Sequence, residues 1–396
     1  MVSNKVFIVG SCRTAIGKFG GTLMKLSAAD MGVVVAGDAL KRSGIEAKSI
    51  EESFFGCGRQ AGTGPNVARQ ITHRIGVPVD RPATTINMAC ASSIQTIIEA
   101  ARAIRLGERD VVLVGGTESM SNVPHYIFGA RWGIPLGKSA LVDAMYHDGF
   151  HCKLCDMVMG ETVDKLAKVK NISRGDQDEY ALLSQNRTAI SQKRGTFTKE
   201  ITPVTVKSRK GDKVFEIDEH PREGATLDGF AKLKPIFGAD GTVTAGNACG
   251  ITDGASAMIM LSEKKLNELG VSPDVELIEY SQSGVKPELM GLGPVPAVKK
   301  LLKKSDLNLS DIDLIELNEA FAGQVLACQR ELGLDMDKLN VKGGAIALGH
   351  PIGATGARIV TTLVHTMRDQ NVEYGMATLC VSGGQGAALL LRNCGN

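Results

Sequence analysis

Short apolar runs and helical patterns alternate along the first third of the chain. The run Val6 to Gly10 predicts a strand, and Ser27 with Asp30 resembles a capping box that opens a helix reaching about Lys41. The same reading predicts an extended stretch at 84–87, a helix at 94–104 that stops at Gly107, and a buried strand at 111–114. Strands that lead into helices in this way indicate an α/β protein.

The last third of the chain repeats this order. It predicts a strand at 313–317, a helix from near Glu319, a glycine-rich loop at 343–356, a helix through Ile359 and Met367, and a hairpin of the runs 376–381 and 387–391. The 396 residues exceed the usual size of one core. We therefore predict two similar α/β halves with mixed sheets, 1–119 with 251–273 and 274–396, and an inserted lid at 120–250 that covers a ligand.

Charge and cysteine content exclude several classes of protein. The formal net charge is +2, which favours neither nucleic acid nor an anionic membrane surface as a partner. The N-terminal segment lacks the pattern of a signal peptide, and no apolar run reaches membrane-spanning length. Nine cysteines, an odd number spread along the chain, do not suit a disulfide framework. We expect a cytoplasmic protein.

Two residues with nucleophile and base chemistry stand at predicted element junctions. Cys90 lies where a strand passes into a helix, and a thiolate at a helix start is stabilised, which predicts a lowered pKa. His350 lies in the glycine-rich loop, where backbone can approach a ligand closely and an imidazole can act as base and donor. Taken alone, Cys90 also fits a small buried core residue, and His350 a turn histidine.

Four further positions have side chains suited to chemistry. Cys380 and Asn318 each end an apolar strand, so neither is placed like the middle of a core element. Cys152 and Cys155 have the CxxC spacing of zinc or redox sites. No second pair accompanies them, and we expect no metal site.

Together these positions resemble the thiolase family, and the resemblance extends over essentially the whole chain. The segments that carry it, in chain order, are 224–228 (GATLD), 241–247 (GTVTAGN), 290–294 (MGLGP), 318–321 (NEAF), 343–358 with its Gly-His-Pro-Ile-Gly core, and Cys380 with Gly383-Gly384. The resemblance implies a layered αβαβα thiolase-like fold. It also implies coenzyme A thioesters as substrates, with no cofactor.

The resemblance assigns a role to each matched catalytic position. It makes Cys90 the acylated nucleophile, His350 its activating base and Cys380 the second acid/base. His350 and a water held by Asn318 form one oxyanion hole, and the backbone N–H groups of Cys90 and Ser382 form the other. On the coenzyme A side, Arg222 matches a position that meets the nucleotide phosphates, and Met159, Phe237 and Phe321 match positions along the pantetheine channel or acyl pocket.

The sequence departs from the family pattern near the site. Cys90 is followed by Ala91-Ser92-Ser93 in place of the usual Gly-Ser-Gly, and Ser382 replaces a glycine. Cys249 stands where a serine commonly contacts the pantetheine arm. Val158 stands where short-chain members carry histidine, which predicts a more apolar wall and better tolerance of longer acyl chains.

The function implied is that of an acetyl-CoA C-acetyltransferase acting through an acyl-Cys90 intermediate. The first alternative is a 3-ketoacyl-CoA thiolase of broader chain length. A ketoacyl synthase-like condensing enzyme is disfavoured by Cys380, and a noncatalytic coenzyme A- or lipid-binding relative by the intact catalytic positions. The segment from Arg131 to Phe150 resembles a tetramerisation loop, so a homotetramer is expected.

Overall fold

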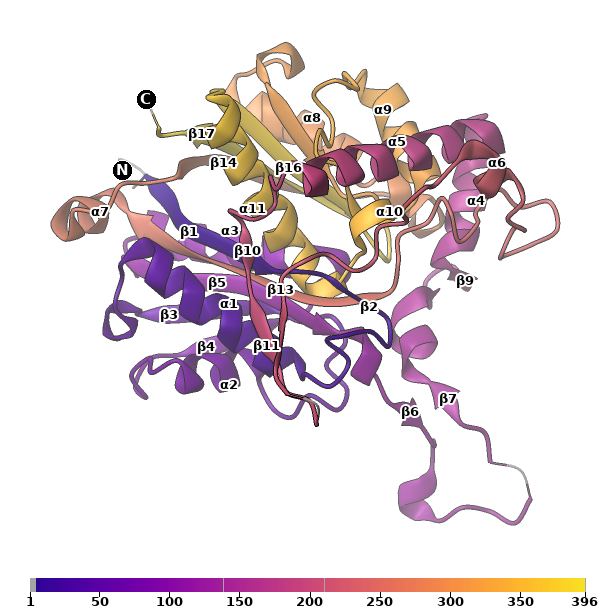
Figure 1. The fold of residues 1–396 in the computed structure, drawn as a ribbon, viewed down its shortest axis with the longest axis horizontal. Helices are drawn as coiled ribbons and strands as arrows, with labels where there is room; N and C mark the ends of the chain where they lie inside the picture. Colours follow the sequence, from indigo (N-terminus) through magenta and orange to yellow (C-terminus); the bar gives the residue numbers. More distant parts are fainter. Residues whose placement is uncertain (1–4, 138, 210, 396) are drawn as a thin grey trace.

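The computed structural model describes residues 5–137, 139–209 and 211–395 (Figure 1). A long mixed sheet runs through the molecule. Its strands, in spatial order, are β15 (Leu314–Leu317), β16 (Tyr374–Val381), β17 (Gln385–Asn393), β14 (Val275–Gly284), β1 (Val6–Thr14), β13 (Thr252–Ser262), β5 (Val111–Ser119), β3 (Glu52–Gly56) and β4 (Ala83–Ile86). The short strands β2 (Gly17–Lys18) and β10 (Ile201–Thr202) pair with β13 and β1.

The sheet consists of two halves that meet at β1 and β14. These two strands pair over only two positions, Phe7 with Glu276 and Ile8 with Val275. Outward from this seam, the order β1-β13-β5-β3 in one half matches β14-β17-β16-β15 in the other. The prediction of two similar mixed-sheet halves is confirmed. The exact residue ranges proposed for the three parts remain a prediction.

Helices cover both outer faces and fill the space between the halves. The helices are α1 (Ala28–Ser43), α2 (Val67–Arg74), α3 (Ser92–Arg105), α4 (Met159–Val169), α5 (Arg174–Lys193), α6 (Leu227–Ala231), α7 (Glu263–Leu269), α8 (Pro294–Ser305), α9 (Ala322–Leu332), α10 (Ala345–Leu348) and α11 (Ile352–Gln370). Helices α1 and α2 pack on the N-terminal half, and α8 on the C-terminal half. Helices α3 and α11 pack on each other and on strands of the sheet. The result is the predicted αβαβα layering.

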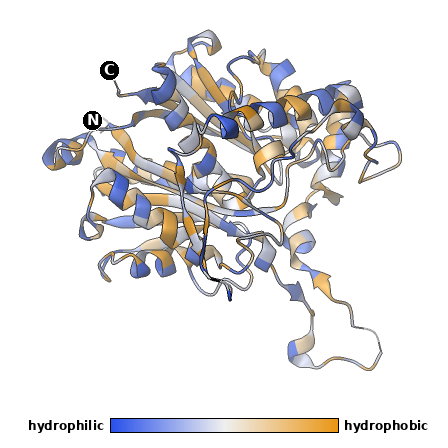
Figure 2. Cartoon of the chain, viewed as in Figure 1, coloured by the Kyte–Doolittle hydropathy of each residue, from blue (hydrophilic) through white to orange (hydrophobic). Residues whose placement is uncertain are grey.

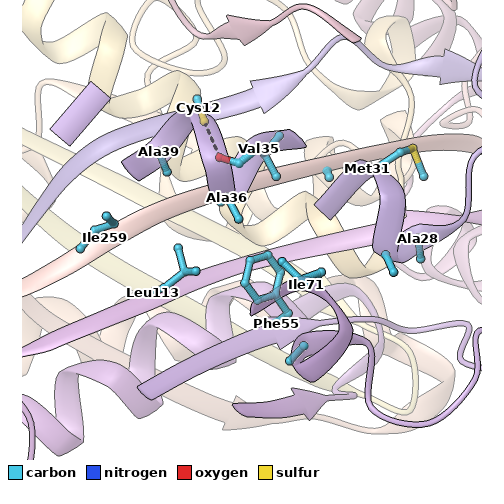
Figure 3. Close-up of a cluster of buried hydrophobic side chains, with 14 of the residues drawn as sticks. Cys12, Ala28, Met31, Val35, Ala36, Ala39, Phe55, Ile71, Leu113 and Ile259 are labelled. Carbon is cyan, nitrogen blue, oxygen red and sulfur yellow. Dashed lines mark hydrogen bonds between the residues drawn. The ribbon is translucent and has the colours of Figure 1, made fainter. Parts of the chain in front are cut away.

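Separate apolar clusters hold these layers together. Figure 3 shows part of the outer N-terminal cluster, in which Met31, Val35 and Ala36 of α1 face Phe55, Leu113 and Ile259 of the sheet. Cys12 belongs to this cluster and donates its thiol to the carbonyl of Val35 at 3.2 Å. A second cluster surrounds α3 and α11. In Figure 2 the interior strands are mainly white to orange, because both of their faces are covered.

The glycine-rich segment differs from the prediction. It was expected to be a loop as far as Gly356, but α10 occupies 345–348 and α11 begins at Ile352. A Cβ atom on Gly353 would lie 2.7 Å from the carbonyl oxygen of Thr117, and one on Gly356 would lie 2.5 Å from the amide nitrogen of Ile94. These glycines therefore allow a buried helix to pack closely on β5 and α3, and they do not interrupt it.

The residues between β5 and β13 form the segment predicted as a lid, which holds the helices α4, α5 and α6 together with several short strands. Three two-stranded ribbons lie in it: β6 (His125–Tyr126) with β7 (Val142–Asp143), β8 (His151–Cys152) with β9 (Met157–Val158), and β11 (Val204–Val206) with β12 (Lys213–Phe215). Figure 1 shows the β6–β7 loop extending away from the body of the molecule. Among the described residues, no helix has the length and apolar character needed to span a bilayer.

Candidate active site

Cys90 lies in a single turn of 3-10 helix, Ala89–Ala91, between β4 and α3. Ala89 has φ +46°, in the left-handed region, where a residue with a Cβ atom is strained. The hydroxyl of Ser92 holds this turn, because it accepts from the amide of Met88 at 3.0 Å and donates to the carbonyl of Ala89 at 2.6 Å. Cys90 is thereby fixed just before a helix, as predicted.

His350 lies between α10 and α11 and is buried. Its Nδ1 is 2.6 Å from the Thr355 hydroxyl, which donates its own proton to the carbonyl of Pro351 at 2.9 Å. Because a hydroxyl has one proton, Thr355 must accept from Nδ1–H. The opposite nitrogen, Nε2, is therefore unprotonated, and it has no protein partner. This is the tautomer that a base toward a thiol requires.

Cys380 is the penultimate residue of β16, with a side chain 1% exposed. Ser382 follows in the turn to β17, in which Gly383 and Gly384 have φ +88° and +83°. These left-handed angles explain the two glycines of the turn. The predicted hairpin is thus confirmed, and its turn brings the amide of Ser382 to the thiol of Cys90.

Asn318 directly follows β15, the parallel neighbour of β16, so Asn318 and Cys380 leave the sheet at the same edge. The amide of Asn318 donates to the carbonyl of Thr378 at 3.0 Å. Its buried side-chain oxygen and nitrogen both lack protein partners. The next residue, Glu319, is anchored by hydrogen bonds from Tyr180, Ser184, Asn340 and the amide of Ile346. Asn318 is therefore held rigidly while its amide remains available to a water or a ligand.

A small cavity of about 70 Å³ collects most of these groups. Its lining includes Cys90, His350, Cys380 and Ser382, together with Arg59, Met290, Phe150 and Ile352. The four predicted residues come from the starts of α3 and α11 and from the end of β16. Segments far apart in the sequence thus place two thiols, an imidazole and a backbone turn around one space.

A larger cavity of about 300 Å³ adjoins the first and shares part of its wall. Met159, Cys249, Phe321 and His350 line both spaces. The predicted substrate-side residues Val158, Arg222 and Phe237 line the larger cavity. Its wall is mostly apolar, and Val158 forms part of it as the residue before α4.

Arg222 is the cation of this larger cavity. Its Nη2 donates to the carbonyl of Ala245 at 2.5 Å, and its backbone amide donates to the side chain of Gln185 at 2.9 Å. Burial lowers the pKa of its guanidinium. The side chain thus carries a positive charge with no carboxylate within ion-pair distance in the described part of the chain.

The cavity shifts the titration of the three central groups. Burial raises the pKa of Cys90 above its usual value, although the amides of Ser382 and Cys90 oppose the shift. Burial also raises the pKa of Cys380, and the neighbouring Cys90 adds to the effect. Burial, aided by the charges of Arg358 and Arg59, lowers the pKa of His350 to about 3. Near neutral pH all three groups are therefore uncharged.

The expected lowering of the Cys90 pKa is wrong. A helix start favours a thiolate, but removing the sulfur from water disfavours it, and desolvation is the larger of the two effects here. A buried, protonated thiol becomes a nucleophile only when a base removes its proton, and the unprotonated Nε2 of His350 belongs to the same cavity.

The described residues hold no group of three or more His, Cys, Asp or Glu placed to bind a metal ion. Cys152 lies in β8, and Cys155 lies in the turn between β8 and β9. Hydrogen bonding to Cys152 contributes to the raised pKa of Cys155, after burial. The expectation that no metal belongs to the protein remains an expectation.

Comparison with known proteins agrees with this geometry. Residues 6–264 match the family described as thiolase, N-terminal domain, and residues 271–393 match thiolase, C-terminal domain. The chain belongs to the thiolase family.

This thiolase is similar to curated proteins and to solved structures over nearly its full length. It is 45% identical to the acetyl-CoA acetyltransferase of Syntrophomonas wolfei subsp. wolfei, with 98% of this chain and 99% of that protein covered. It is 46% identical to the acetyl-CoA acetyltransferase of Cupriavidus necator, with 97% and 98% covered. The crystal structure of human mitochondrial 3-ketoacyl-CoA thiolase in complex with CoA is 40% identical, with a TM-score of 0.95 and 98% of each chain covered.

The departures of this thiolase from the family pattern have structural counterparts. Ser93 stands where the pattern has its second glycine, and its hydroxyl accepts from the amide of Ala357 in α11 at 2.9 Å. Ser93 thus joins the start of α3 to the helix that follows His350. Cys249 donates its amide to the carbonyl of Ala320 at 3.0 Å, and burial raises the pKa of its thiol to about 12.

Sequence reasoning missed Glu118, Thr355 and Arg59. Glu118 lies near the end of the apolar strand β5, so the signal that singled out Cys380 was present there too. Its buried carboxylate accepts from the amides of Gly58, Arg59 and Gly353. Thr355 lies five residues after His350, within the matched segment. For Arg59, no local sequence signal exists.

The pKa of Cys90 predicts how fast its thiol reacts. Because burial raises that pKa, alkylation of Cys90 by iodoacetamide should accelerate continuously from pH 6 to pH 9.5, by up to about tenfold per pH unit. Peptide mass spectrometry that follows Cys90 separately from the other cysteines measures the rate. A plateau reached by pH 7 would contradict the prediction, because it would reveal a thiolate already stabilised by the helix start.

Thr355 is expected to position His350 through its tautomer. Thr355→Val leaves Nδ1–H buried without an acceptor, a cost of about 1–3 kcal/mol, so acylation of Cys90 should slow by about 10–100-fold. Thr355→Ser keeps the hydroxyl and should stay within about threefold of the parent. Stopped-flow detection of the CoA released from acetyl-CoA measures the rate of acylation. The KM for acetyl-CoA should stay unchanged in both variants. Equal rates for the Val and Ser variants would exclude this role.

Proposed function

We propose that this thiolase is an acetyl-CoA C-acetyltransferase, catalysing the reversible condensation of two acetyl-CoA molecules to acetoacetyl-CoA and CoA. The observation that carries the proposal is the cavity in which Cys90, Cys380 and the unprotonated Nε2 of His350 meet. The full-length relatives that bear the name acetyl-CoA acetyltransferase support it. The steps below follow from the geometry and the protonation states.

In the first half-reaction, Nε2 of His350 takes the proton of Cys90 as the sulfur attacks the acetyl carbonyl. The amides of Cys90 and Ser382, which favour a negative sulfur, are proposed as the donors to the developing oxyanion. CoA then leaves as a thiolate and takes a proton. Cys380 suits the role of donor, because its raised pKa keeps its thiol protonated.

In the second half-reaction, the same raised pKa makes the Cys380 thiolate a strong base. It removes a proton from the α-carbon of a second acetyl-CoA. The resulting enolate oxygen accepts from His350, which now carries a proton on Nε2, and from a water bound by the unpartnered amide of Asn318. The enolate carbon attacks the acetyl group on Cys90, the Cys90 sulfur leaves and takes back the proton held on Nε2 of His350, and acetoacetyl-CoA forms. Thiolytic cleavage is the reverse sequence.

The larger cavity supplies a route for the coenzyme A arm. Arg222 offers a positive charge there, and the solved human relative was crystallised with CoA. Acyl-CoA, acetyl-CoA and CoA are therefore proposed as the small-molecule partners. The apolar wall at Val158 favours a second candidate, a thiolase that also cleaves longer 3-ketoacyl chains.

We also propose that the chain assembles as a tetramer through the β6–β7 loop, residues 127–141. This loop carries several exposed apolar side chains, with Trp132 88% exposed and Leu136 fully exposed. A cluster of this kind on a projecting loop is typical of an interaction surface.

We propose a reducing, cytoplasmic location because all nine cysteines are free thiols.

Substitutions of Cys90 and Cys380 are predicted to block different steps of the reaction. Cys380→Ser should still accept an acetyl group on Cys90, but acetoacetyl-CoA synthesis should slow by about 10²–10⁴-fold, because a serine hydroxyl is a poor base at neutral pH. Cys90→Ser should form no rapid acyl-enzyme. Mass spectrometry after brief exposure to acetyl-CoA, together with a condensation assay, measures both effects. Near-normal condensation in Cys380→Ser, or an adduct on Cys380 of the parent enzyme, would reverse the assignment.

The loop predicts the oligomeric state. The parent protein should scatter light as a particle of about four times the 41.9 kDa chain mass, and Leu136→Glu should reduce it to a dimer, because a charge cannot be buried in an apolar contact without cost. Leu269→Glu, on α7 at the opposite end of Figure 1, is the matched control and should leave the mass unchanged. A monomer mass for the parent at micromolar concentration would refute the proposal.

A further inference from the structure

Arg59 is a buried cation in the wall of the small cavity. It lies three residues after the end of β3, and the residue is only 6% exposed. Among the described residues that line this cavity with Cys90, Arg59 is the only one with a permanently charged side chain. The remaining wall is largely apolar, with Met290, Phe150 and Ile352 in it.

The guanidinium of Arg59 has few partners. No carboxylate of the described residues lies within ion-pair distance of it, and its Nε has no hydrogen-bond partner. Within the described part of the chain, its side chain makes one hydrogen bond, a long one from Nη1 to the carbonyl of Gly58 at 3.5 Å. The ring of Phe150 lies 5.8 Å from Cζ. A buried charge with so little compensation is costly unless a further group pairs with it.

The nearby carboxylates are already engaged. Glu118 accepts from three backbone amides, and Asp148 accepts from Tyr126 at 2.5 Å and lies 2.6 Å from Nδ1 of His147. Both feel the charge of Arg59 at longer range, since it favours their ionised forms. Neither supplies the fork of paired oxygens that an arginine binds best.

The chain also makes room for this side chain. A Cβ atom on Gly149 would lie 2.1 Å from Nη2 of Arg59 and 2.4 Å from its Nε. The guanidinium therefore rests against the backbone of the lid, and a larger residue at 149 would displace it. The loop after β3 and the lid, about ninety residues apart in the sequence, together hold the charge at the acyl end of the site.

We propose that Arg59 selects acyl groups that end in a carboxylate, so that this thiolase transfers short dicarboxylic monoacyl groups as well as acetyl. The inference rests on the proposed function and adds a substrate class to it. In condensation, Cys90 takes the acyl group from its CoA thioester and releases CoA. The acetyl-CoA enolate then attacks that acyl group, which yields a 3-oxo-dicarboxylyl-CoA and frees Cys90. The cavity of about 70 Å³ restricts the chain to a short one.

The test compares two acyl donors of similar shape. Succinyl-CoA ends in a carboxylate, and 4-methylpentanoyl-CoA ends in an isopropyl group that has a similar outline and no charge. The parent enzyme should acylate Cys90 from succinyl-CoA with kcat/KM at least about tenfold higher, because a site built for a polar group rejects the analogue that lacks it. An equal or reversed preference would overturn the inference without any variant.

Variants at Arg59 then identify the cause. Arg59→Leu should lower the ratio of the two kcat/KM values by about a hundredfold, and Arg59→Lys, which keeps the charge but loses the fork, should lower it by less. An equal fall for both donors would mean that Arg59 acts on Cys90 and does not recognise the substrate, and would overturn the inference. Acetylation of Cys90 by acetyl-CoA in the parent enzyme is the separate readout. Its absence would defeat the proposed function, whereas its presence without a succinyl preference would defeat this inference alone.

Discussion

The buried carboxylate of Glu118 joins the parts of the molecule that form the site. It accepts from the amides of Gly58 and Arg59, both at 2.9 Å, and from that of Gly353 at 2.7 Å. Gly353 is the second residue of α11, so the carboxylate also caps the positive end of that helix. Burial raises the pKa of Glu118, and the three amides oppose this shift because they stabilise the ionised carboxylate. Since Gly353 lies between His350 and Thr355 in the chain, one side chain ties the start of α11 to the loop that carries Arg59.

Close backbone contact is the second requirement of the architecture. A Cβ atom on Gly116 of β5 would lie 2.1 Å from the carbonyl oxygen of Gly353, and one on Gly56 would lie 2.6 Å from the amide nitrogen of Ser93. These glycines let β3, β5, α3 and α11 approach to backbone distance. The starts of α3 and α11 then converge on one point, where Cys90 and His350 lie. The catalytic geometry is thus a result of packing between segments, and no single loop contains it.

Much of this organisation could be predicted from the sequence, because strand ends and helix starts leave local signals. Polar Cys380 and Asn318 stood out against the apolar runs that precede them, and the capping box at Ser27 and Asp30 is present as expected. The segment 343–356 was mistaken for a loop because glycine usually interrupts helices, and only its neighbours Thr117 and Ile94 explain why it does not here. The pKa of Cys90 depends on desolvation by the whole cavity. The guanidinium of Arg59 fits beside Cys90 only because residue 149 is a glycine, and no local sequence pattern connects these two positions.

The central position of β1 has a consequence for the way the protein is made. Val6 pairs with Ser262, and Phe7 with Glu276, so β1 finds its two long partner strands only when more than 250 further residues exist, although its end meets the short β10 at Ile201 earlier. At roughly 5–20 residues per second, a ribosome needs on the order of tens of seconds to produce them. During that interval the apolar side chains of β1 have no sheet to enter. The N-terminal half therefore cannot complete its sheet until β13 and β14 have been made, and truncation anywhere before β14 leaves β1 with an open edge.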